Sequence, residues 1–509
     1  MTDITVATRF AEADTVAGRV RGSWRGEPGA GGSAAFLGIP FAKAPVGELR
    51  FAAPVPAAPW EGVRDALEFG ATAHRDASGI TLIPEPAIPG DSTLNVNVFT
   101  PAPGRNGAAL PVIVWIHGGG YISGSPASPW YDGRAFTRDG VVTVTISYRL
   151  GFDGFGCIEG APSNRGVRDW LLALQWVQDN IAEFGGDPAR VTIAGQSAGG
   201  GAVLTLLGMP AAQHLFHAAW AMSAALADVS QERARAAAER LAALAGVTPT
   251  REGFASVSEQ TLHGLQSKAG DPEPDDRLAV ARSLLGDGLP WGPSVDGELV
   301  PRPTIESLRA GVGADKPLVI GSTDDEFTMV LDGAARKLRF IPVGIALAKL
   351  GVPRARRRAY LADNRAQRRL GTAAMLGRYV TDTVFRSTVV RVAEARATGA
   401  QVSAGPGHAA TWAYRFSWPS PTKRWALHCL DVPFWFDCLD EPHVAAIAGD
   451  APPHRLAAAV HGAAVGLARG DDPGWRPWSD AAGTTRVFGG AASAPDVIAD
   501  GYRSVRALV

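Results

Sequence analysis

The sequence predicts an α/β protein, in which a mostly parallel central sheet is covered by helices on both faces. Residues 111–116, 141–146 and 191–194 are apolar runs rich in β-branched side chains, as expected of strands buried on both faces. Residues 169–184 lie between the second and third runs, and their apolar side chains recur at helical spacing. A strand, a helix and a strand in this order imply a right-handed crossover between parallel strands.

The remainder of the chain extends this architecture. Residues 318–320 and 412–416 have the composition of later strands of the same sheet. Two Ala- and Arg-rich stretches, about 230–285 and 335–400, are predicted to be helical insertions over the rim. Because no low-complexity linker or internal repeat interrupts the sequence, residues 1–509 are predicted to form a single domain.

Composition and charge do not suggest a polyanionic partner. The chain is 46% hydrophobic and 19% charged, with a formal net charge of −1, as in ordinary globular proteins. This balance gives no reason to expect nucleic acid or an anionic membrane as a partner. The arginines between 354 and 369 could form an anion site or a solvated helix face, and the balanced charge favours the second interpretation.

The sequence also suggests a location. It contains no apolar run of about eighteen residues, so no membrane span is expected. The first residues lack the features of a signal peptide, which favours the cytoplasm. Cys157, Cys429 and Cys438 are too few for a disulfide framework and are expected to be free thiols, although a pair of Cys429 with Cys438 stays open.

Residues 195–199 form a G-x-S-x-G motif between the predicted strand at 191–194 and a small-residue helix. A serine on such a tight strand-to-helix turn has its hydroxyl exposed, and small neighbours allow the turn to close. The start of the following helix directs backbone N–H groups toward negative charge that develops nearby. Ser197 is therefore the candidate nucleophile.

A run of glycines follows the predicted strand at 111–116, in the sequence His117-Gly118-Gly119-Gly120. Glycines let backbone amides approach a substrate carbonyl without a Cβ in the way. Acyl transfer passes through a tetrahedral oxyanion, which preorganised N–H donors stabilise. The predicted donors are the N–H groups of Gly119, Gly120 and Ala198.

A nucleophilic serine needs a base and an acid that orients the base. In this type of site the serine comes first in the chain, the acid second and the histidine last. His428 is the favoured base, because it lies downstream of Ser197 and follows the predicted strand at 412–416. Candidates for the acid follow the strand at 318–320. There, Asp324, Asp325 and Glu326 are consecutive, and the pattern alone leaves the choice among them open.

With these motifs in place, the chain resembles the type B carboxylesterases, the cholinesterase-like branch of the α/β-hydrolase fold, and among them the bacterial carboxylesterase or p-nitrobenzyl esterase type. The matching segments run in order through most of the chain: residues 36–42, 45–51, 164–176, 180–188, 292–297 and 475–478. The resemblance implies hydrolysis of carboxylic esters through an acyl-enzyme, without a cofactor or metal. It places the acid on Glu326 and the base on His428.

Four positions depart from the family pattern. Gln196 stands before the nucleophile where Glu is common, and its side chain need not take part in the chemistry. Thr93 replaces the cysteine of an early disulfide, which favours a cytoplasmic enzyme of the bacterial type. Phe327 replaces the Gly after the acid, and Trp170 replaces a Gln. Phe327 is expected to reshape the wall of the active-site gorge.

The sequence leaves alternatives to ester hydrolysis. Relatives leave cleavage of carbamates or aryl amides open, and a non-catalytic binding module is a remote alternative that the intact serine disfavours. His214 and His217 are three residues apart on a predicted helix, but without a third ligand they are expected to be packing residues.

The substrate is expected to be a small-molecule ester with an apolar or aromatic portion, and the sequence does not indicate the oligomeric state. Aromatic residues near the predicted catalytic loops either line the substrate pocket or pack in the core. They are Tyr121, Trp291, Phe327, Trp418, Phe434 and Trp435.

Overall fold

The computed structural model describes residues 9–29, 31–74, 82–271, 273, 277–402 and 407–509. Its centre is a thirteen-stranded sheet with the order β1-β2-β3-β5-β7-β6-β8-β9-β10-β11-β12-β13, and β4 pairs with β2. The seven strands from β7 to β12 in this order are mutually parallel, and the pairs toward both edges are antiparallel apart from β2 with β4. The predicted α/β class is confirmed.

The strands have the following bounds: β1 Phe10–Thr15, β2 Gly18–Arg25, β3 Ser33–Pro40, β4 Val63–Asp65, β5 Asn95–Thr100, β6 Leu110–Ile116, β7 Val142–Ile146, β8 Gly186–Gln196, β9 Ala218–Met222, β10 Leu318–Thr323, β11 Thr411–Phe416, β12 Thr485–Phe488 and β13 Val497–Ile498. All five runs that the sequence predicted as strands lie within β6, β7, β8, β10 and β11, apart from Val141, which precedes β7. The predicted helix is α3 Arg165–Asn180, continued by the short turn η3 Ile181–Phe184.

Two apolar cores fill the two faces of the sheet. Along β6, Val112, Val114 and Ile116 belong to one core, whereas Ile113 and Trp115 belong to the other. This alternation follows from the two-residue period of a strand. Helices α3, α4 Ala198–Leu207 and α15 Ser387–Val402 cover the first face, and α1 Arg134–Arg138, α16 Val432–Trp435 and α18 His454–Arg469 cover the second.

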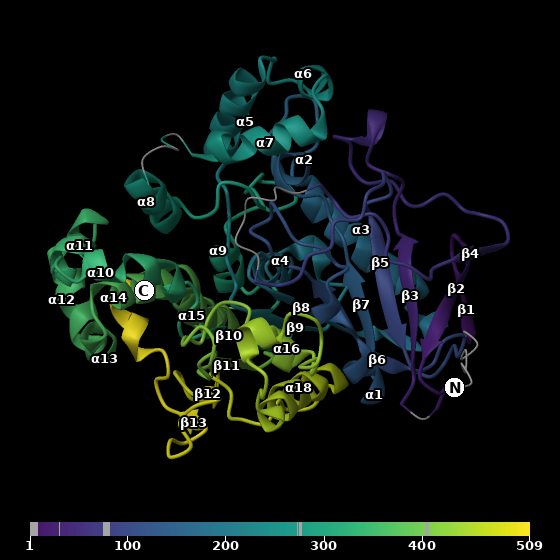
Figure 1. Cartoon of the computed structure of the whole chain (residues 1–509). Helices are drawn as coiled ribbons and strands as arrows, with labels where there is room; N and C mark the ends of the chain where they lie inside the picture. The colour runs from purple at the N-terminus through teal and green to yellow at the C-terminus, as the bar shows by residue number, and fades with distance from the viewer. Residues whose placement is uncertain (1–8, 30, 75–81, 272, 274–276, 403–406) are drawn as a thin grey trace, which may run out of the picture.

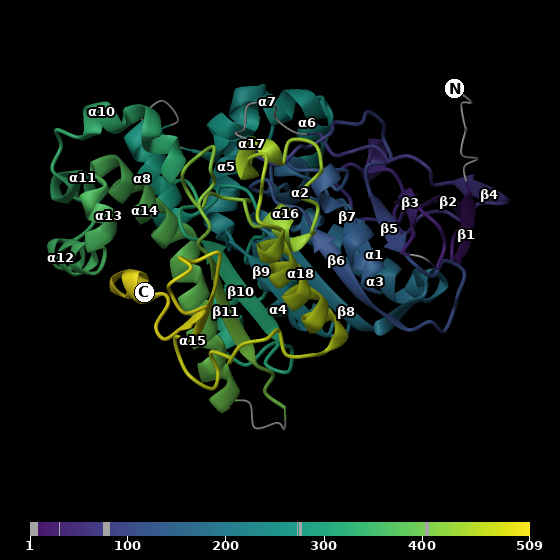
Figure 2. The same cartoon turned by 60° about the horizontal axis from the view of Figure 1, so that its bottom comes forward.

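Helical segments occupy the two stretches predicted as insertions. The first contains α5 Gln231–Ala245, α6 Arg251–Ala255, α7 Glu259–Gly270 and α8 Arg277–Asp287; the second contains α10 Ala335–Leu338, α11 Val343–Lys349, α12 Arg354–Asp363, α13 Arg365–Arg369, α14 Thr372–Thr381 and the π-helical turn η6 Asp382–Arg386. In Figure 1, α10–α13 lie together beyond one end of the sheet, and α5–α7 lie in a separate group. Helix α15 packs on β10 and β11, so the last part of the second stretch covers the sheet and not its rim (Figure 2).

The other helices are short. They are α2 Gly151–Phe155, α9 Thr304–Arg309, α17 Ala445–Ala448, η1 Gly47–Leu49, η2 Pro129–Tyr131, η4 Pro210–Ala212, η5 Thr328–Ala334 and η7 Arg503–Leu508. Among the described residues, no helix has both the length and the apolar character that crossing a membrane requires. The single-domain organisation stays a prediction.

Candidate active site

Ser197 lies between the end of β8 and the first residue of α4. Its backbone has φ 60° and ψ −123°, a strained region that residues other than glycine rarely adopt. Its N–H donates to the Met222 carbonyl at 2.9 Å, and its carbonyl accepts from Gly201 and Ala225 at 2.9 and 3.0 Å. Because these three bonds tie the turn to β9 and α4, the strain is held in place by the surrounding fold.

The glycines around Ser197 are required by close backbone contacts. A Cβ on Gly199 would lie 2.0 Å from the Ile116 carbonyl oxygen, and one on Gly195 would lie 2.5 Å from the Gly199 oxygen. A Cβ on Gly118 would lie 2.7 Å from the Gln196 oxygen. The G-x-S-x-G motif and the glycine run after β6 therefore pack directly against each other.

Backbone N–H groups of the glycine run are available to a ligand. Gly119 has φ +106°, and its carbonyl accepts from the N–H and the hydroxyl of Ser123, both at 2.9 Å. Within the described part of the chain, no acceptor pairs with the N–H of Gly119 or Gly120. Ala198 begins α4, and the first N–H groups of a helix have no acceptor within it.

His428 and Glu326 form a buried pair. The Nδ1–H of His428 donates to Glu326 Oε2 at 2.5 Å, and the second carboxylate oxygen accepts from the Thr323 N–H at 2.9 Å. The Glu326 carbonyl also accepts from the His428 N–H at 2.8 Å. Glu326 is fully buried and His428 is 5% exposed, so water does not screen this charge-assisted bond.

Gln196 occupies the other ring nitrogen of His428. Its Nε2 lies 3.1 Å from His428 Nε2. Because Nδ1 carries the proton given to Glu326, Nε2 of the neutral ring is an acceptor and the Gln196 amide is the donor. Ser197 Oγ makes no hydrogen bond to the ring among the described residues. The Gln196 side chain, which the sequence did not require for the chemistry, is thus in hydrogen-bond contact with the candidate base.

The two carboxylates before Glu326 point to other partners. Asp324 accepts from Arg386 at 2.6 Å, from Arg415 at 2.6 Å and from Ser417 at 2.7 Å. Burial alone would raise the pKa of Asp324, but Arg415 and Arg386 hold it well below its usual range.

Asp325 contacts the helical insertion and not the imidazole. It accepts from Arg378 at 3.0 Å and from Gln367 at 2.7 Å. Burial raises the pKa of Asp325, although Arg378 opposes that shift. Of the three acids that the pattern left open, only Glu326 makes a hydrogen bond to His428.

Two further groups near His428 carried no signal in the sequence. Burial raises the pKa of Asp431 to about 7, and the charge of Glu326 adds to this shift; Asp431 accepts from the Tyr414 hydroxyl at 3.2 Å. The Phe385 ring lies 5.0 Å from the His428 ring. Phe385 comes from η6, and nothing in local sequence links that turn to the site.

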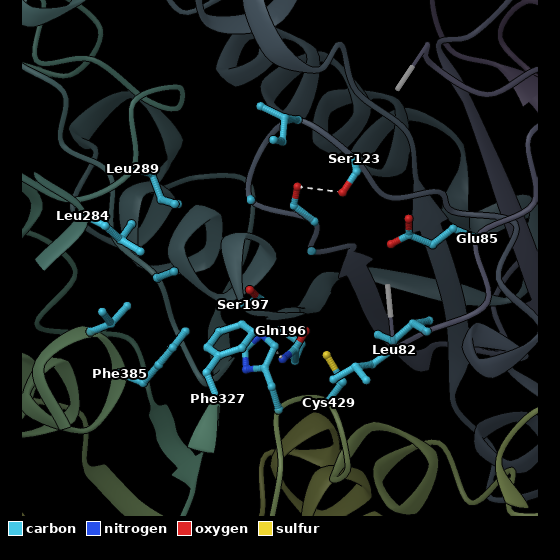
Figure 3. A pocket seen from close by; sticks show the side chains of 18 of the residues that line it. Leu82, Glu85, Ser123, Gln196, Ser197, Leu284, Leu289, Phe327, Phe385 and Cys429 are labelled. Carbon is cyan, nitrogen blue, oxygen red and sulfur yellow. Dashed lines mark hydrogen bonds between the residues drawn. The ribbon is translucent and has the colours of Figure 1, made fainter. Parts of the chain in front are cut away.

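A cavity of about 310 Å³ opens beside Ser197, Gln196, His428 and Gly118–Gly120 (Figure 3). Its other walls are mostly apolar side chains from the segment before β5, the loops after β6 and β10, α8 and the loop after it, and the second insertion. They include Leu82, Ile83, Ile122, Leu284, Leu289, Trp291, Phe327, Val380, Val384 and Phe385. In Figure 3, Leu284, Leu289 and Phe385 lie on one side of Ser197, and Glu85 and Ser123 lie on the other.

Only two of the six predicted pocket aromatics, Trp291 and Phe327, line this cavity. The other four pack against neighbouring rings: Tyr121 against Phe155 at 5.3 Å, Trp418 against Phe434 at 5.2 Å, Phe434 also against Phe416 at 5.3 Å, and Trp435 against Trp115 at 5.1 Å. Proximity in sequence to a catalytic loop does not determine which face of the loop a side chain occupies, so the pocket assignment of these four is corrected.

The sequence also predicts the state of the three cysteines and the position of His214 and His217. Cys157, Cys429 and Cys438 are unpaired, and Cys429 lines the cavity. His214 and His217 lie in a turn between η4 and β9, not on a helix as predicted. In the portion of the chain that the structure covers, no cluster of three or more His, Cys, Asp or Glu side chains could hold a metal ion.

The sheet order, the strained serine between a parallel strand and a helix, and the buried histidine–carboxylate pair define a serine hydrolase of the α/β-hydrolase fold. The chain belongs to the carboxylesterase family, because the family model matches residues 8–443. This membership confirms the resemblance seen in the sequence. The protein is therefore a carboxylic-ester hydrolase whose substrates are small-molecule esters.

Similar proteins agree with this assignment. Para-nitrobenzyl esterase of Bacillus subtilis is 33% identical over 417 residues, which are 80% of this chain and 79% of that protein. Liver carboxylesterase of Sus scrofa is 38% identical over 340 residues, 62% of this chain and 59% of that protein. A solved structure of the Geobacillus stearothermophilus carboxylesterase EST55 has a TM-score of 0.81 at 33% identity and covers 98% of this chain and 99% of that chain.

Proposed function

We propose that the chain cleaves its ester through an acyl-enzyme on Ser197, with His428 as general base and then general acid, and with Glu326 as the group that orients His428. The hydrogen bond from His428 to Glu326 supports this assignment most directly. It fixes the proton on Nδ1 and leaves Nε2, on the side of the serine turn, as the nitrogen that can accept a proton.

Acylation starts when Ser197 Oγ attacks the ester carbonyl carbon while its proton moves to His428 Nε2. Because Nε2 has one lone pair, the Gln196 amide must release it first. The tetrahedral intermediate then breaks its bond to the alcohol oxygen, which takes the proton from Nε2. The alcohol leaves, and the acyl group stays on Ser197.

Deacylation repeats the sequence with water. Nε2 takes a proton from a water molecule as its oxygen attacks the acyl carbon, and the proton then returns to Ser197 Oγ as the carboxylic acid leaves. Both tetrahedral intermediates carry an oxyanion. We assign its stabilisation to the N–H groups of Gly119, Gly120 and Ala198, each donor lowering the barrier by about 3 kcal/mol.

The substrate belongs, in this proposal, to esters with an apolar or aromatic portion. The cavity walls support it, because Trp291, Phe327 and Phe385 offer ring surface and leucines and valines fill most of the remaining wall. The alcohol or acyl group of such an ester gains contact area on the side of Leu284 and Phe385 (Figure 3). A cytoplasmic location is part of the same proposal and is supported by the three unpaired thiols.

Replacing the nucleophile tests the proposal. Ser197→Ala is expected to lower kcat/KM for p-nitrophenyl butyrate by roughly a millionfold, because the acyl-enzyme cannot form. The matched control is Ser123→Ala, which removes a different hydroxyl from the same cavity wall and should keep activity within about tenfold. Comparable turnover by a folded Ser197→Ala protein would rule out the mechanism. A panel of esters of graded acyl length, with aryl carbamates and anilides beside them, then defines the substrate.

A further inference from the structure

The segment 335–370, here called the basic lobe, concentrates positive charge. It contains α10, α11, α12 and α13. Asp363 is its single acidic residue, against eleven basic ones, although the whole chain has a net charge of −1. The basic residues are Arg336, Lys337, Arg339, Lys349, Arg354, Arg356, Arg357, Arg358, Arg365, Arg368 and Arg369.

These charges are exposed and are not used in ion pairs. All of the eleven except the half-buried Arg357 are exposed, and none forms a salt bridge with another described residue. Arg378 and Arg386, which follow the lobe in sequence, behave differently: they are buried and bind Asp325 and Asp324. Arg378 and Arg386 therefore have buried carboxylate partners, whereas the basic residues of the lobe form no salt bridge with a described residue.

Large apolar side chains are exposed on the same lobe. Phe340 is 74% exposed, Leu370 60% and Ile345 53%. The Ile341 carbonyl accepts from the Thr372 hydroxyl at 2.7 Å, which brings the chain at Leu370 beside Phe340 and Ile341. Arg339 lies over the Phe340 ring at 4.5 Å. A cationic side chain thus lies directly on an exposed apolar one in this lobe.

The lobe adjoins the active-site cavity. Leu347 and Tyr360 of the lobe share a small core with Met375 of α14, and Leu285 of α8 packs against this core. Arg282 of α8 also donates to the Lys349 carbonyl at 2.8 Å. Leu284 lies between these two residues of α8, lines the cavity and is itself exposed. Both views place α8 beside α10 and α11 (Figures 1 and 2).

We propose that the basic lobe docks on a lipid surface that carries anionic headgroups, with its arginines on the headgroups and Phe340, Ile345 and Leu370 in the outer acyl layer. Anionic lipid attracts clustered arginines, and exposed apolar side chains gain by leaving water there. Nucleic acid could use the charges and the Phe340 ring, but it would leave the exposed side chains of Ile345 and Leu370 in water, because aliphatic side chains do not stack on bases. Docking brings the rim of the cavity at α8 close to the lipid.

This inference differs from the expectation of no membrane partner, which came from the charge of the whole chain. A balance of −1 averages over a segment in which basic residues outnumber acidic ones eleven to one. Docking of this kind needs no membrane-spanning helix. It also does not depend on the ester chemistry, so it can be tested in protein that lacks the nucleophile.

The test measures sedimentation of the Ser197→Ala protein with vesicles of phosphatidylcholine alone and of phosphatidylcholine mixed with phosphatidylglycerol. We expect binding to be about tenfold or more tighter to the mixed vesicles and to weaken as salt is added. The triple variant Arg354→Gln, Arg356→Gln, Arg358→Gln should lose about tenfold of this binding. The control is the triple variant Arg105→Gln, Arg235→Gln, Arg455→Gln, which loses the same number of positive charges from exposed residues outside the lobe. It should bind the mixed vesicles as tightly as the parent protein does.

A second variant, Phe340→Ser with Leu370→Ser, should also weaken vesicle binding while the charge is unchanged. Both lobe variants, made with Ser197 intact, are expected to hydrolyse dissolved p-nitrophenyl butyrate at the parental rate, which verifies their fold. Equal binding to the two kinds of vesicle, or equal loss in the control triple variant, overturns the proposal. Binding of single-stranded RNA without vesicle binding overturns the proposal and assigns the lobe to nucleic acid instead.

Discussion

Gln196 and Ser197 are adjacent residues that need the same nitrogen. In the structure, the Gln196 amide holds His428 Nε2 at 3.1 Å, and in the proposed reaction Ser197 must take its place. An amide N–H can donate to a neutral imidazole, whereas a carboxylate at this position favours the protonated ring. The residue before the nucleophile should therefore set the pH at which the base becomes neutral.

Gln196→Glu tests this dependence. A carboxylate about 3 Å from Nε2 should move the midpoint of the ascending limb of kcat/KM to higher pH by about 1–2 units. The other groups facing the ring, Glu326 and Asp431, are the same in both proteins. A pH profile from pH 5 to 9 with p-nitrophenyl butyrate gives the midpoint, with Gln196→Ala as the control for lost volume. An unchanged midpoint in Gln196→Glu would show that residue 196 does not act on the base.

Replacement of single carboxylates separates the three acids after β10. Glu326→Gln should lower kcat/KM by about a thousandfold or more, because the imidazolium loses its buried countercharge. Asp325→Asn should stay within about tenfold, since Asp325 bonds to Arg378 and Gln367 and not to the ring. Steady-state kinetics at pH 8 decides between them. A crippled Asp325→Asn beside an active Glu326→Gln would move the acid to the neighbouring residue.

At the scale of elements, the loop after β10 is tied to the helical insertion by ion pairs. Asp324 joins this loop to η6 through Arg386 and to β11 through Arg415, and Asp325 joins it to α14 through Arg378. The loop also carries Glu326. The position of the predicted acid therefore depends on contacts with a segment more than fifty residues further along the chain.

Asp324→Asn should reduce the free energy of unfolding by about 3 kcal/mol at pH 7, because it leaves Arg386 buried without this partner. Asp324 has a depressed pKa in the folded protein. Its contribution is therefore complete above the unfolded value, near 4, and fades as pH falls below that value. Urea unfolding at pH 7, 5 and 4 measures the difference, with the exposed Asp315→Asn as control. Equal stability of variant and parent at pH 7 would contradict the structural role of this ion pair.

Across the whole molecule, local sequence patterns predict most of the fold but only part of the active site. The strands were predictable because β-branched runs lie on them, and the serine turn was predictable because close contacts at Gly195 and Gly199 demand glycine. The contact between Gln196 and His428 joins residues 232 positions apart. No local pattern encodes such a pairing.

The pocket was the least predictable part. Its walls include Val384 and Phe385 of η6, Leu284 of α8 and Leu82, which are far from the motifs in sequence. Most of the aromatic residues near the motifs instead fill the core, as Trp435 does against Trp115. The docking of the insertions on the sheet decides which side chains reach the cavity, and single-sequence periodicity does not report that docking.

Identifying the residue that becomes acylated tests most directly whether Ser197 is the nucleophile. The wild-type enzyme is mixed with p-nitrophenyl acetate, quenched in acid within the first turnovers and digested, and the peptides are identified by mass spectrometry. We expect one acetyl group on the peptide that contains Ser197 and none on that peptide in Ser197→Ala. Two results would show that Ser197 is not the nucleophile. One is an acetyl group that forms on another residue and turns over with the substrate, and the other is steady hydrolysis without acetylation of Ser197.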